Sequence, residues 1–166
     1  IFALRESGCR PGEVFGLVAD RVDLPAQTWT VANKTRSKTG VETRTIYLSP
    51  ALAALSRKLI EQHPSGPIFR NREGRPWTPH AVACRFAELR AKLGLGKEAT
   101  AYAIRHRFAI EALRRGIDPS DLAAIMGHAD SAMIERVYGH YDQQHERLRA
   151  AVNRMRAGRP SAASGR

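Results

Sequence analysis

The chain has 166 residues, 43% of them hydrophobic, which suits one globular domain with a sizeable core and excludes a disordered chain. Its 27 Lys and Arg residues outnumber its 16 Asp and Glu residues, and the formal net charge of +11 favours a polyanionic partner such as DNA or RNA. A basic scaffold protein or a membrane-surface binder is the alternative explanation of that charge. No stretch is long and apolar enough to cross a membrane, and we expect no secretory signal.

The amino-terminal residues predict the end of one helix followed by a second, short helix. Residues 2–4 are apolar, and Gly8 is suited to end their helix because glycine reaches positive φ without steric cost. Pro11 suits the first turn of the short helix. The first residue is Ile1 rather than Met, so we expect a fragment that begins inside a domain of a longer protein.

Strands are predicted in the next part of the chain, where β-branched and aromatic residues gather. Two are expected at Thr28–Asn33 and Arg44–Leu48, and Asp20–Leu24 is a candidate for a third, short strand. Between the first two lies Lys34–Gly40, a polar segment whose glycine suits a hairpin loop. These segments predict a small antiparallel sheet.

The rest of the chain is predicted to be helical, because apolar residues recur there at helical spacing. The expected bounds are Ala51–Gln62, Pro79–Leu93, Thr100–Arg115, Pro119–Gly127, Ser131–Tyr138 and Gln143–Met155. In the third of these helices, we expect Ile104, Phe108 and Ala112 to face the core. Asp118 precedes Pro119 as a helix cap.

The two cysteines, Cys9 and Cys84, are far apart in sequence and lie in segments that read as helical. We expect both to be reduced, packed thiols of a cytosolic protein. The sequence contains no convincing cluster of metal ligands.

Five polar residues stand in settings where catalytic groups are usually presented, near predicted helix ends and loop tips: Arg10, Lys38, Arg105, His128 and Tyr138. Each has an ordinary explanation when taken alone. The arginines suit a solvated basic surface, Lys38 is one loop lysine among several, His128 suits a helix cap, and Tyr138 suits a half-buried aromatic. Their order along the chain is what makes them informative.

The local settings of these residues, taken in order, resemble the tyrosine recombinase family of phage-integrase type. The matching features are the turn Gly8-Cys9-Arg10-Pro11-Gly12-Glu13, the Lys38 hairpin, the Arg105-His106 helix, the turn Met126-Gly127-His128, and the late Tyr138. The resemblance runs from about Ser7 to Arg156, and five motifs in order are far more specific than one. It implies an α+β, mainly α-helical integrase-type catalytic domain, the DNA breaking-rejoining enzyme fold, with a small antiparallel sheet of about three strands. The catalytic domain would span residues 1–156, truncated at its amino terminus, and residues 157–166 would form a flexible basic tail.

The resemblance also implies a reaction, namely site-specific DNA recombination through a 3′-phosphotyrosyl intermediate. Arg10 and Arg105 would grip the phosphate, and His128 would add a hydrogen bond to it. Tyr138 would attack the phosphorus, while Lys38 would protonate the departing 5′-oxygen. The covalent intermediate stores the bond energy, so the reaction would need no ATP. The cationic clamp of Arg10 and Arg105 would take the place of a metal, and no cofactor is expected.

Some positions depart from the family or remain open. Tyr102 stands three residues before Arg105, where the family commonly has histidine, and a phenol is a poor general base at neutral pH. Tyr141 is the fallback for Tyr138 as nucleophile. Glu13 either orients Arg10 or the lysine hairpin, or is an ordinary acid at a helix start. Phosphate contacts from DNA-binding residues are expected at Lys34, Arg36 and Arg44.

The expected partner is double-stranded DNA, with a homotetramer on DNA for the full-length protein, a monomer for the fragment alone, and no membrane. The expected location is cytoplasmic and nucleoid-associated, in a bacterial or phage-encoded protein. Three alternatives remain: a type IB topoisomerase-like enzyme that relaxes DNA, a catalytically inactive DNA-binding remnant, and a non-enzymatic helix-turn-helix module at Leu122–Tyr138. The last does not explain the Arg10 and Lys38 motifs.

Overall fold

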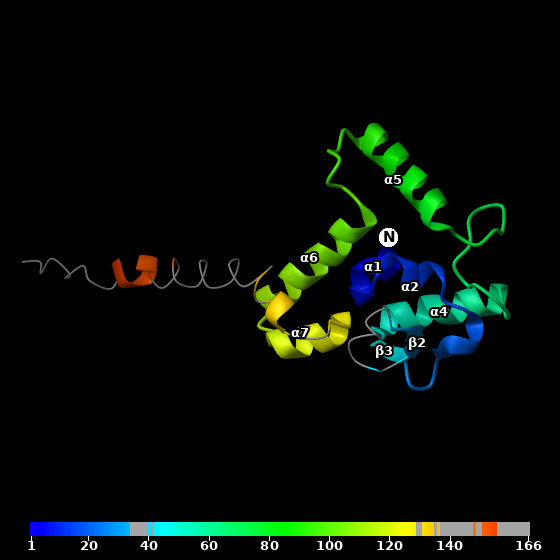
Figure 1. Cartoon of the computed structure of the whole chain (residues 1–166), viewed down its shortest axis with the longest axis horizontal. Coiled ribbons are helices and arrows are strands. Elements are labelled where there is room, and N and C mark those ends of the chain that lie inside the picture. The colour runs from blue at the N-terminus through cyan, green and yellow to red at the C-terminus, as the bar shows by residue number, and fades with distance from the viewer. Residues whose placement is uncertain are drawn as a thin grey trace, which may run out of the picture.

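A computed structural model describes residues 1–33, 40, 42–128, 131–134, 136, 148 and 151–155. Helices predominate, and a small sheet, whose strands come between α2 and α4 in the chain, lies beside α4 (Figure 1). In chain order the elements are α1 (Phe2–Ser7), α2 (Pro11–Phe15), the 3₁₀ turn η1 (Ala19–Arg21), β1 (Val22–Asp23), β2 (Thr28–Ala32), β3 (Thr43–Tyr47), α4 (Pro50–Gln62), α5 (Pro79–Leu93), α6 (Ala101–Arg114) and α7 (Pro119–Met126). The predicted α+β, mainly helical fold is confirmed.

The sheet is antiparallel and has the order β1-β2-β3. Trp29 on β2 pairs with Val22 on β1 and with Ile46 on β3, so this fully buried tryptophan stands on the central strand. The predicted third strand is real but is only two residues long. The N–H of Asn33 donates to the carbonyl of Glu42 at 2.8 Å, which continues the pairing of β2 with β3 beyond the strand ends.

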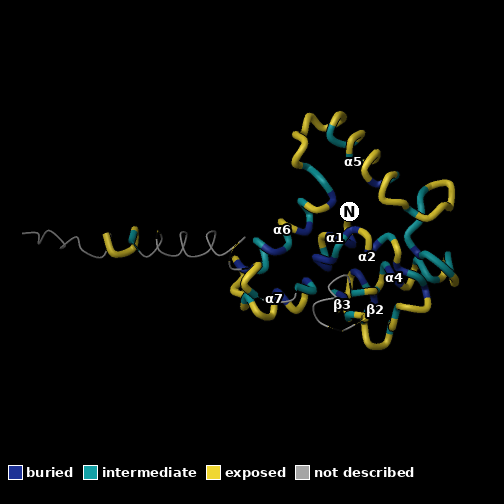
Figure 2. Tube along the Cα trace, viewed as in Figure 1, coloured by how far each residue is buried: buried dark blue, intermediate teal, exposed yellow. Residues whose placement is uncertain are grey.

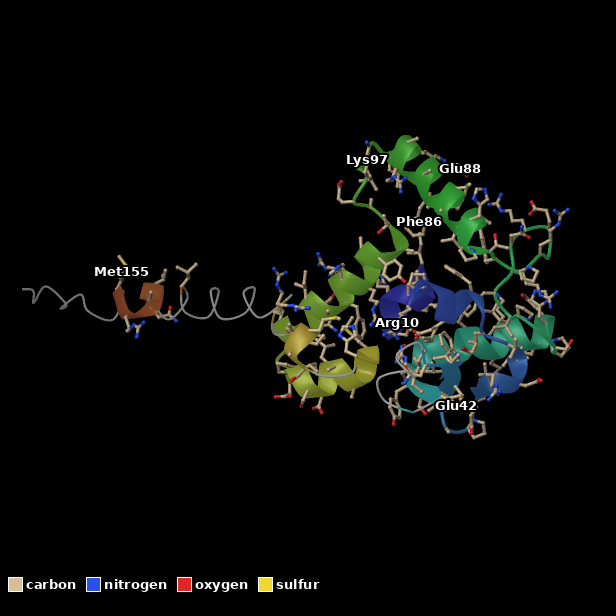
Figure 3. All side chains as sticks on the ribbon, viewed as in Figure 1. Arg10, Glu42, Phe86, Glu88, Lys97 and Met155 are labelled. Atoms are coloured by element: carbon tan, nitrogen blue, oxygen red, sulfur yellow. The ribbon has the colours of Figure 1, made fainter. Side chains whose placement is uncertain are left out.

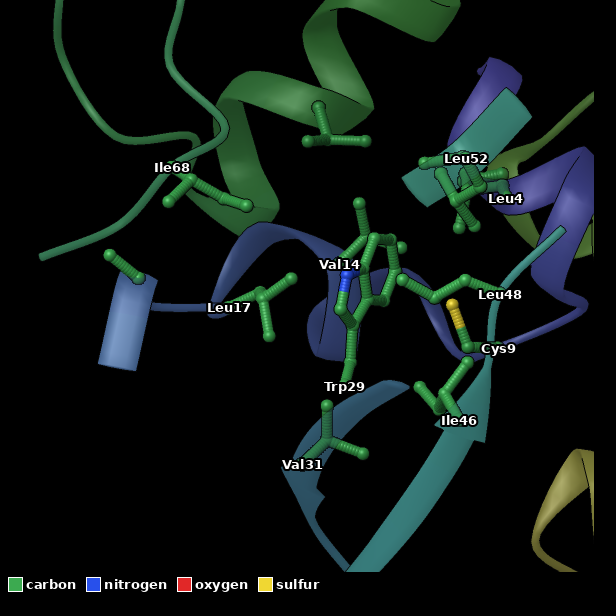
Figure 4. Close-up of a cluster of buried hydrophobic side chains, with 14 residues drawn as sticks. Leu4, Cys9, Val14, Leu17, Trp29, Val31, Ile46, Leu48, Leu52 and Ile68 are labelled. Carbon is green, nitrogen blue, oxygen red and sulfur yellow. The ribbon is translucent and has the colours of Figure 1, made fainter. Parts of the chain in front are cut away.

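The main core surrounds Trp29, whose side chain is fully buried among aliphatic residues of the helices and the sheet (Figure 4). Its ring meets Phe69 edge to face, with 5.9 Å between the ring centroids. The indole N–H donates to the hydroxyl of Ser56 on α4 at 3.0 Å, which satisfies the one polar atom of the ring. Through this contact α4 is fixed on one face of the sheet.

A second, smaller core joins α6 to α7 and to the residues after α7. Its buried members are Ala109, Leu113, Leu122, Ala123, Met126 and Ile134. The start of α7 is capped as the sequence predicts, because the Asp118 side chain accepts from the N–H of Ser120 at 2.7 Å. These contacts fix the carboxyl end of α7 against α6.

Helix α5 lies away from the other helices in Figure 1, and most of its length is exposed in Figure 2. Val82 is its buried residue, while Phe86, labelled in Figure 3, is partly buried against the main core. A largely apolar cavity of about 500 Å³ separates α5 from α1 and α4. Leu93, at the end of this helix, is exposed.

Ile104, Phe108 and Ala112 pack against the two cores as expected, although they are only partly buried. The buried residues of α6 are Ala101, Arg105, Ala109 and Leu113, so its inner face includes an arginine, which hydrophobic periodicity counts as polar. One expectation about packing was wrong. Of the two free thiols, Cys9 is buried between α1 and α2, but Cys84 is exposed on α5.

The predicted helices at the carboxyl end are described only in part. Residues 132–134, 136, 148 and 151–155 are helical, while the remaining residues of those two helices and the 157–166 tail lie outside the described residues. Among the helices that are described, none has the length and hydropathy needed to cross a membrane.

Candidate active site

Three arginines from distant parts of the sequence converge on the carboxyl end of α7. Arg44 on β3 donates through Nη1 to the carbonyl of Ile125 at 2.9 Å. Arg105 on α6 donates through Nη2 to the carbonyl of Met126 at 2.7 Å. Arg10, in the turn between α1 and α2, donates through Nη2 to the carbonyl of Gly127 at 2.7 Å. Each of three consecutive carbonyls therefore receives a different guanidinium.

The chemistry of a helix end explains this convergence. The last carbonyls of a helix have no partner within the helix, and the helix dipole places partial negative charge there. Gly127 ends α7 in the left-handed conformation, with φ of 68°, and the N–H of His128 turns back to the carbonyl of Ala123 at 2.9 Å. The turn leaves the carbonyls of residues 125–127 to accept from side chains that α7 itself does not supply.

Arg10 is held in place by the turn in which it lies. Gly8 ends α1 in the left-handed conformation, with φ of 60°, and a Cβ at this position would overlap the ring of Phe108 on α6. Glu13 then accepts from the backbone N–H of Arg10 at 2.6 Å and from its Nη1 at 3.0 Å. Arg10 is labelled in Figure 3, where its turn lies at the centre of the molecule. Both its main chain and its side chain are therefore fixed by one carboxylate.

Glu13 is only 5% exposed and bridges two of the three arginines. Besides Arg10, it accepts from Nε of Arg44 at 3.1 Å and from Nη2 of Arg44 at 2.7 Å. Burial acts to raise the pKa of this carboxyl, but its hydrogen bonds and ion pairs with Arg44 and Arg10 together hold the pKa below its usual value. Glu13 is thus ionised at neutral pH, and both open readings of it apply, since it caps α2 and orients Arg10.

Arg105 is 6% exposed, which places it in the core rather than on the solvated basic face considered from the sequence. Its Nη1 donates to the carbonyl of Gly8 at 2.7 Å. Burial, followed by the positive charge of Arg10, lowers the pKa of its guanidinium to about 10. It therefore stays protonated at neutral pH, and the cost of burying its charge is offset by the carbonyls around it.

His128 lies directly beside Arg105, with 2.9 Å between its Nε2 and Nη2 of the arginine. A guanidinium has donors only, so Nε2 must act as the acceptor, and the proton of the neutral ring belongs on Nδ1. His128 is therefore more than a helix cap. It lies beside a buried cation that the sequence places 23 residues earlier.

The structure brings together Arg10, Arg105 and His128, as the motif order predicts, and adds Glu13 and Arg44 to them. The Arg44 side chain is only 8% exposed, and its Nε, Nη1 and Nη2 all donate to protein acceptors. Tyr102 lies on the first turn of α6 and is 55% exposed. Lys34, Arg36, Lys38, Tyr138 and Tyr141 lie outside the described residues.

Sequence reasoning missed the contacts between Arg44, Glu13 and the carbonyls of α7. The acidic residue at the third position of α2 was a visible signal for Glu13. Nothing comparable marks Arg44 among the many basic residues, and backbone carbonyls leave no trace in a sequence.

The described site carries three guanidinium groups against one carboxylate, and this excess of positive charge suits an anion held by several hydrogen bonds. In the described part of the chain, no group of three or more His, Cys, Asp and Glu side chains is arranged to hold a metal ion. The guanidinium groups of Arg10, Arg44 and Arg105 are fixed donors of the kind that stabilise negative charge.

Residues 2–145 match the model of the phage integrase family. The chain is similar to the tyrosine recombinase XerC of Mesorhizobium japonicum, with 38% identity over 141 residues, 82% of this chain and 44% of that protein. It is also similar to XerC of Methylobacterium nodulans, with 35% identity over 164 residues, 93% of this chain and 48% of that protein. The chain thus spans less than half the length of these curated relatives.

Solved structures share the fold at low sequence identity. The integrase of the transposon Tn1549 in complex with circular intermediate DNA gives a TM-score of 0.70 at 22% identity, covering 88% of this chain and 57% of that one. The crystal structure of XerA recombinase gives a TM-score of 0.69 at 23% identity, covering 92% of this chain and 56% of that one. At these identities the likeness concerns the fold.

Proposed function

The chain belongs to the phage integrase family, and from that premise we propose that it is the catalytic part of a site-specific tyrosine recombinase that cleaves and rejoins double-stranded DNA. The observation that carries the proposal is the cluster of Arg10, Arg105 and His128 at the end of α7. The XerC relatives, which are named tyrosine recombinases, support it. The DNA complex of the Tn1549 integrase supports double-stranded DNA as the partner.

In the proposed reaction the guanidinium groups of Arg10 and Arg105 bind the scissile phosphate, and His128 donates a further hydrogen bond to it. The remaining N–H groups of the two arginines are available for this, because each guanidinium has five donors and only some are bonded within the protein. The charge that develops on the phosphate oxygens is then met by donors already in place. Such preorganisation is usually the largest single contribution to catalysis.

The covalent step is an exchange of one phosphoester bond for another. The phenolic oxygen of Tyr138 forms a bond to phosphorus while the bond from phosphorus to the 5′-oxygen breaks. Lys38 gives its proton to the 5′-oxygen, and the phenolic proton passes to a base or to water. Rejoining runs the same steps backwards with a 5′-hydroxyl of another strand, so no external energy source enters the balance.

Tyr102 occupies the position where the family commonly has histidine, and we propose that it acts there as a hydrogen-bonding group and not as a base. Residues 1–156 form the catalytic domain in this proposal. The whole protein acts as a homotetramer on two DNA duplexes in the cytoplasm, associated with the nucleoid. The +11 net charge supports contact with a polyanion of this size.

Covalent trapping on DNA tests the proposal. A library of duplexes with a randomised centre is nicked so that cleavage releases a short oligonucleotide and leaves no 5′-hydroxyl for rejoining. Adducts that resist detergent are recovered and sequenced. The assay uses the chain itself and a chimera in which residues 2–145 replace the matching part of M. japonicum XerC, since the chain spans only 44% of that relative.

We expect an adduct that disappears in Tyr138→Phe and persists in the matched control Tyr141→Phe. Loss in Tyr141→Phe with persistence in Tyr138→Phe would assign the nucleophile to Tyr141. The absence of any adduct on the library, with binding to duplex retained, would support an inactive DNA-binding remnant instead.

A further inference from the structure

Arg44 stands at the junction of three segments that carry the proposed site. It lies on β3, the strand that follows the segment containing Lys38 in sequence. Its guanidinium donates to both oxygens of Glu13, the carboxylate that fixes the main chain and side chain of Arg10. Its third nitrogen donates to the carbonyl of Ile125, two residues before the turn that ends at Gly127. Arg10 also links Glu13 to the end of α7, so the two arginines bridge these segments side by side.

The stem of Arg44 is as closely placed as its head group. A Cβ added to Gly127 would lie 2.6 Å from Cδ of Arg44 and 2.7 Å from its Nε, far inside van der Waals contact. The arginine therefore lies directly against the turn that presents His128. Gly127 is needed there for two reasons, namely its φ of 68° and the space that Arg44 fills.

Arg44 differs from Arg10 and Arg105 in that all three of its guanidinium nitrogens donate to described protein oxygens, whereas the other two arginines do so through Nη1 and Nη2 alone. Nε, Nη1 and Nη2 each already donate to a protein oxygen at 3.1 Å or less, and the side chain is 8% exposed. Arg10 also donates to Glu13, through Nη1, while its Nη2 donates to the carbonyl of Gly127 at the end of α7. The planar fork matters for this arrangement, because a lysine ammonium cannot bond both carboxylate oxygens and a carbonyl in one plane.

We propose that Arg44 is a positioning residue that sets Arg10 and the His128 turn relative to one another, and that it is not a DNA phosphate contact. The inference rests on the proposed function for its biological meaning, because the phosphate is what Arg10 and His128 would bind. It assigns β3 a place in the site through Glu13 and the Ile125 carbonyl. This replaces the phosphate contact that we expected for Arg44 from the sequence.

Two variants and one control separate positioning from direct contact. Arg44→Met keeps much of the stem and removes the fork, while Arg44→Lys keeps the charge. Arg115→Met is the matched control, because that arginine is exposed and paired only with Glu111 of its own helix region. Single-turnover cleavage, duplex affinity at several salt concentrations and thermal unfolding are measured for each, with the chimera and the DNA recovered by covalent trapping.

If Arg44 is a positioning residue, the cleavage rate of Arg44→Met should fall by about 10- to 100-fold, since displacing catalytic groups by about 1 Å can reduce rates a hundredfold. Duplex affinity and its salt dependence should stay within about threefold of the wild type, and Arg44→Lys should recover little. A phosphate contact predicts instead weaker duplex binding and a salt slope smaller by about 0.9. That result, or an unchanged cleavage rate, would overturn the proposal.

Chemical rescue distinguishes positioning from a general loss of folding. In Arg44→Ala, added guanidinium chloride should restore cleavage, whereas sodium chloride at the same ionic strength should not. A lack of rescue, with equal losses of affinity, rate and unfolding temperature, would mean that Arg44 only stabilises the fold. Should the wild type form no adduct at all, the proposed function fails. Whether Arg44 positions Arg10 is then tested by the affinity of the chain for sulfate, measured as a rise in unfolding temperature. Arg44→Met must lower this affinity if Arg10 loses its orientation.

Discussion

Replacing Glu13 by glutamine should destabilise the protein strongly, although the two side chains have the same shape. Each carboxylate oxygen accepts two hydrogen bonds: Oε1 from Nη1 of Arg10 and Nε of Arg44, and Oε2 from the N–H of Arg10 and Nη2 of Arg44. Whichever way the amide is turned, its NH₂ group faces two donors. Half of the hydrogen bonds are therefore lost, and two largely buried arginines lose their counter-charge.

The expected cost is about 3–5 kcal/mol, the range for breaking a buried ion pair by removing one partner. Glu88→Gln is the control, because Glu88 pairs with Arg85 on the exposed surface of α5, and such pairs contribute about 0–1 kcal/mol. Urea unfolding followed by circular dichroism measures both free energies of unfolding. A loss below about 1 kcal/mol in Glu13→Gln would refute the assigned network.

The same variant carries a prediction about pH. The folded-state pKa of Glu13 is lowered from 4.5, so its contribution to stability is fully present above pH 4.5 and is lost as the pH falls through the lower folded-state value. The difference in unfolding free energy between wild type and Glu13→Gln should therefore be constant near neutral pH and shrink below pH 4.5. A difference that stays flat in acid would contradict the ionised, buried carboxylate.

Three further outcomes are expected. Gly8→Ala should cost about 2–4 kcal/mol in urea unfolding, because alanine is strained at positive φ and its Cβ overlaps the ring of Phe108. In thiol labelling of the native protein, exposed Cys84 should react quickly and Cys9 only on unfolding, since Cys9 is buried and burial raises its pKa to about 11; equal rates would contradict this packing. Arg105→Lys should reduce the cleavage rate at least tenfold with a smaller loss of duplex affinity, because a lysine cannot bond Gly8, Met126 and His128 together; wild-type kinetics would contradict that role.

The sequence predicted most elements to within one or two residues, because proline, glycine and capping residues mark their ends. It also predicted that Arg10, Arg105 and His128 belong to one site, through the order of the motifs. Burial of Arg105 could not be predicted from periodicity, since a pattern of apolar residues treats every arginine as exposed. What places it inside is a set of backbone carbonyls from Gly8 and Met126.

Arg44 is a second residue whose surroundings could not be predicted from the sequence. Its position beside a polar loop suggested a surface charge, while the pairing of β3 with β2 puts it where Glu13 and α7 meet. The partner of a side chain depends on how distant segments pack, and local sequence carries no signal for that. From the sequence, Glu13 was either an ordinary acid at a helix start or a residue that orients Arg10 or the lysine hairpin. In the structure it both caps α2 and bonds Arg10.

The carbonyls at the end of α7 have a consequence for how this site tolerates sequence change. The acceptors that gather the three arginines belong to the main chain of residues 125–127, so they persist whatever side chains stand at 125 and 126. The side chain of Met126 packs in the second core, so a substitution there acts on that packing and leaves the carbonyl acceptor in place. Side chains can therefore vary at positions 125 and 126, although their carbonyls bind two of the arginines. The residue that cannot vary freely is Gly127, whose left-handed backbone conformation no other residue adopts as readily.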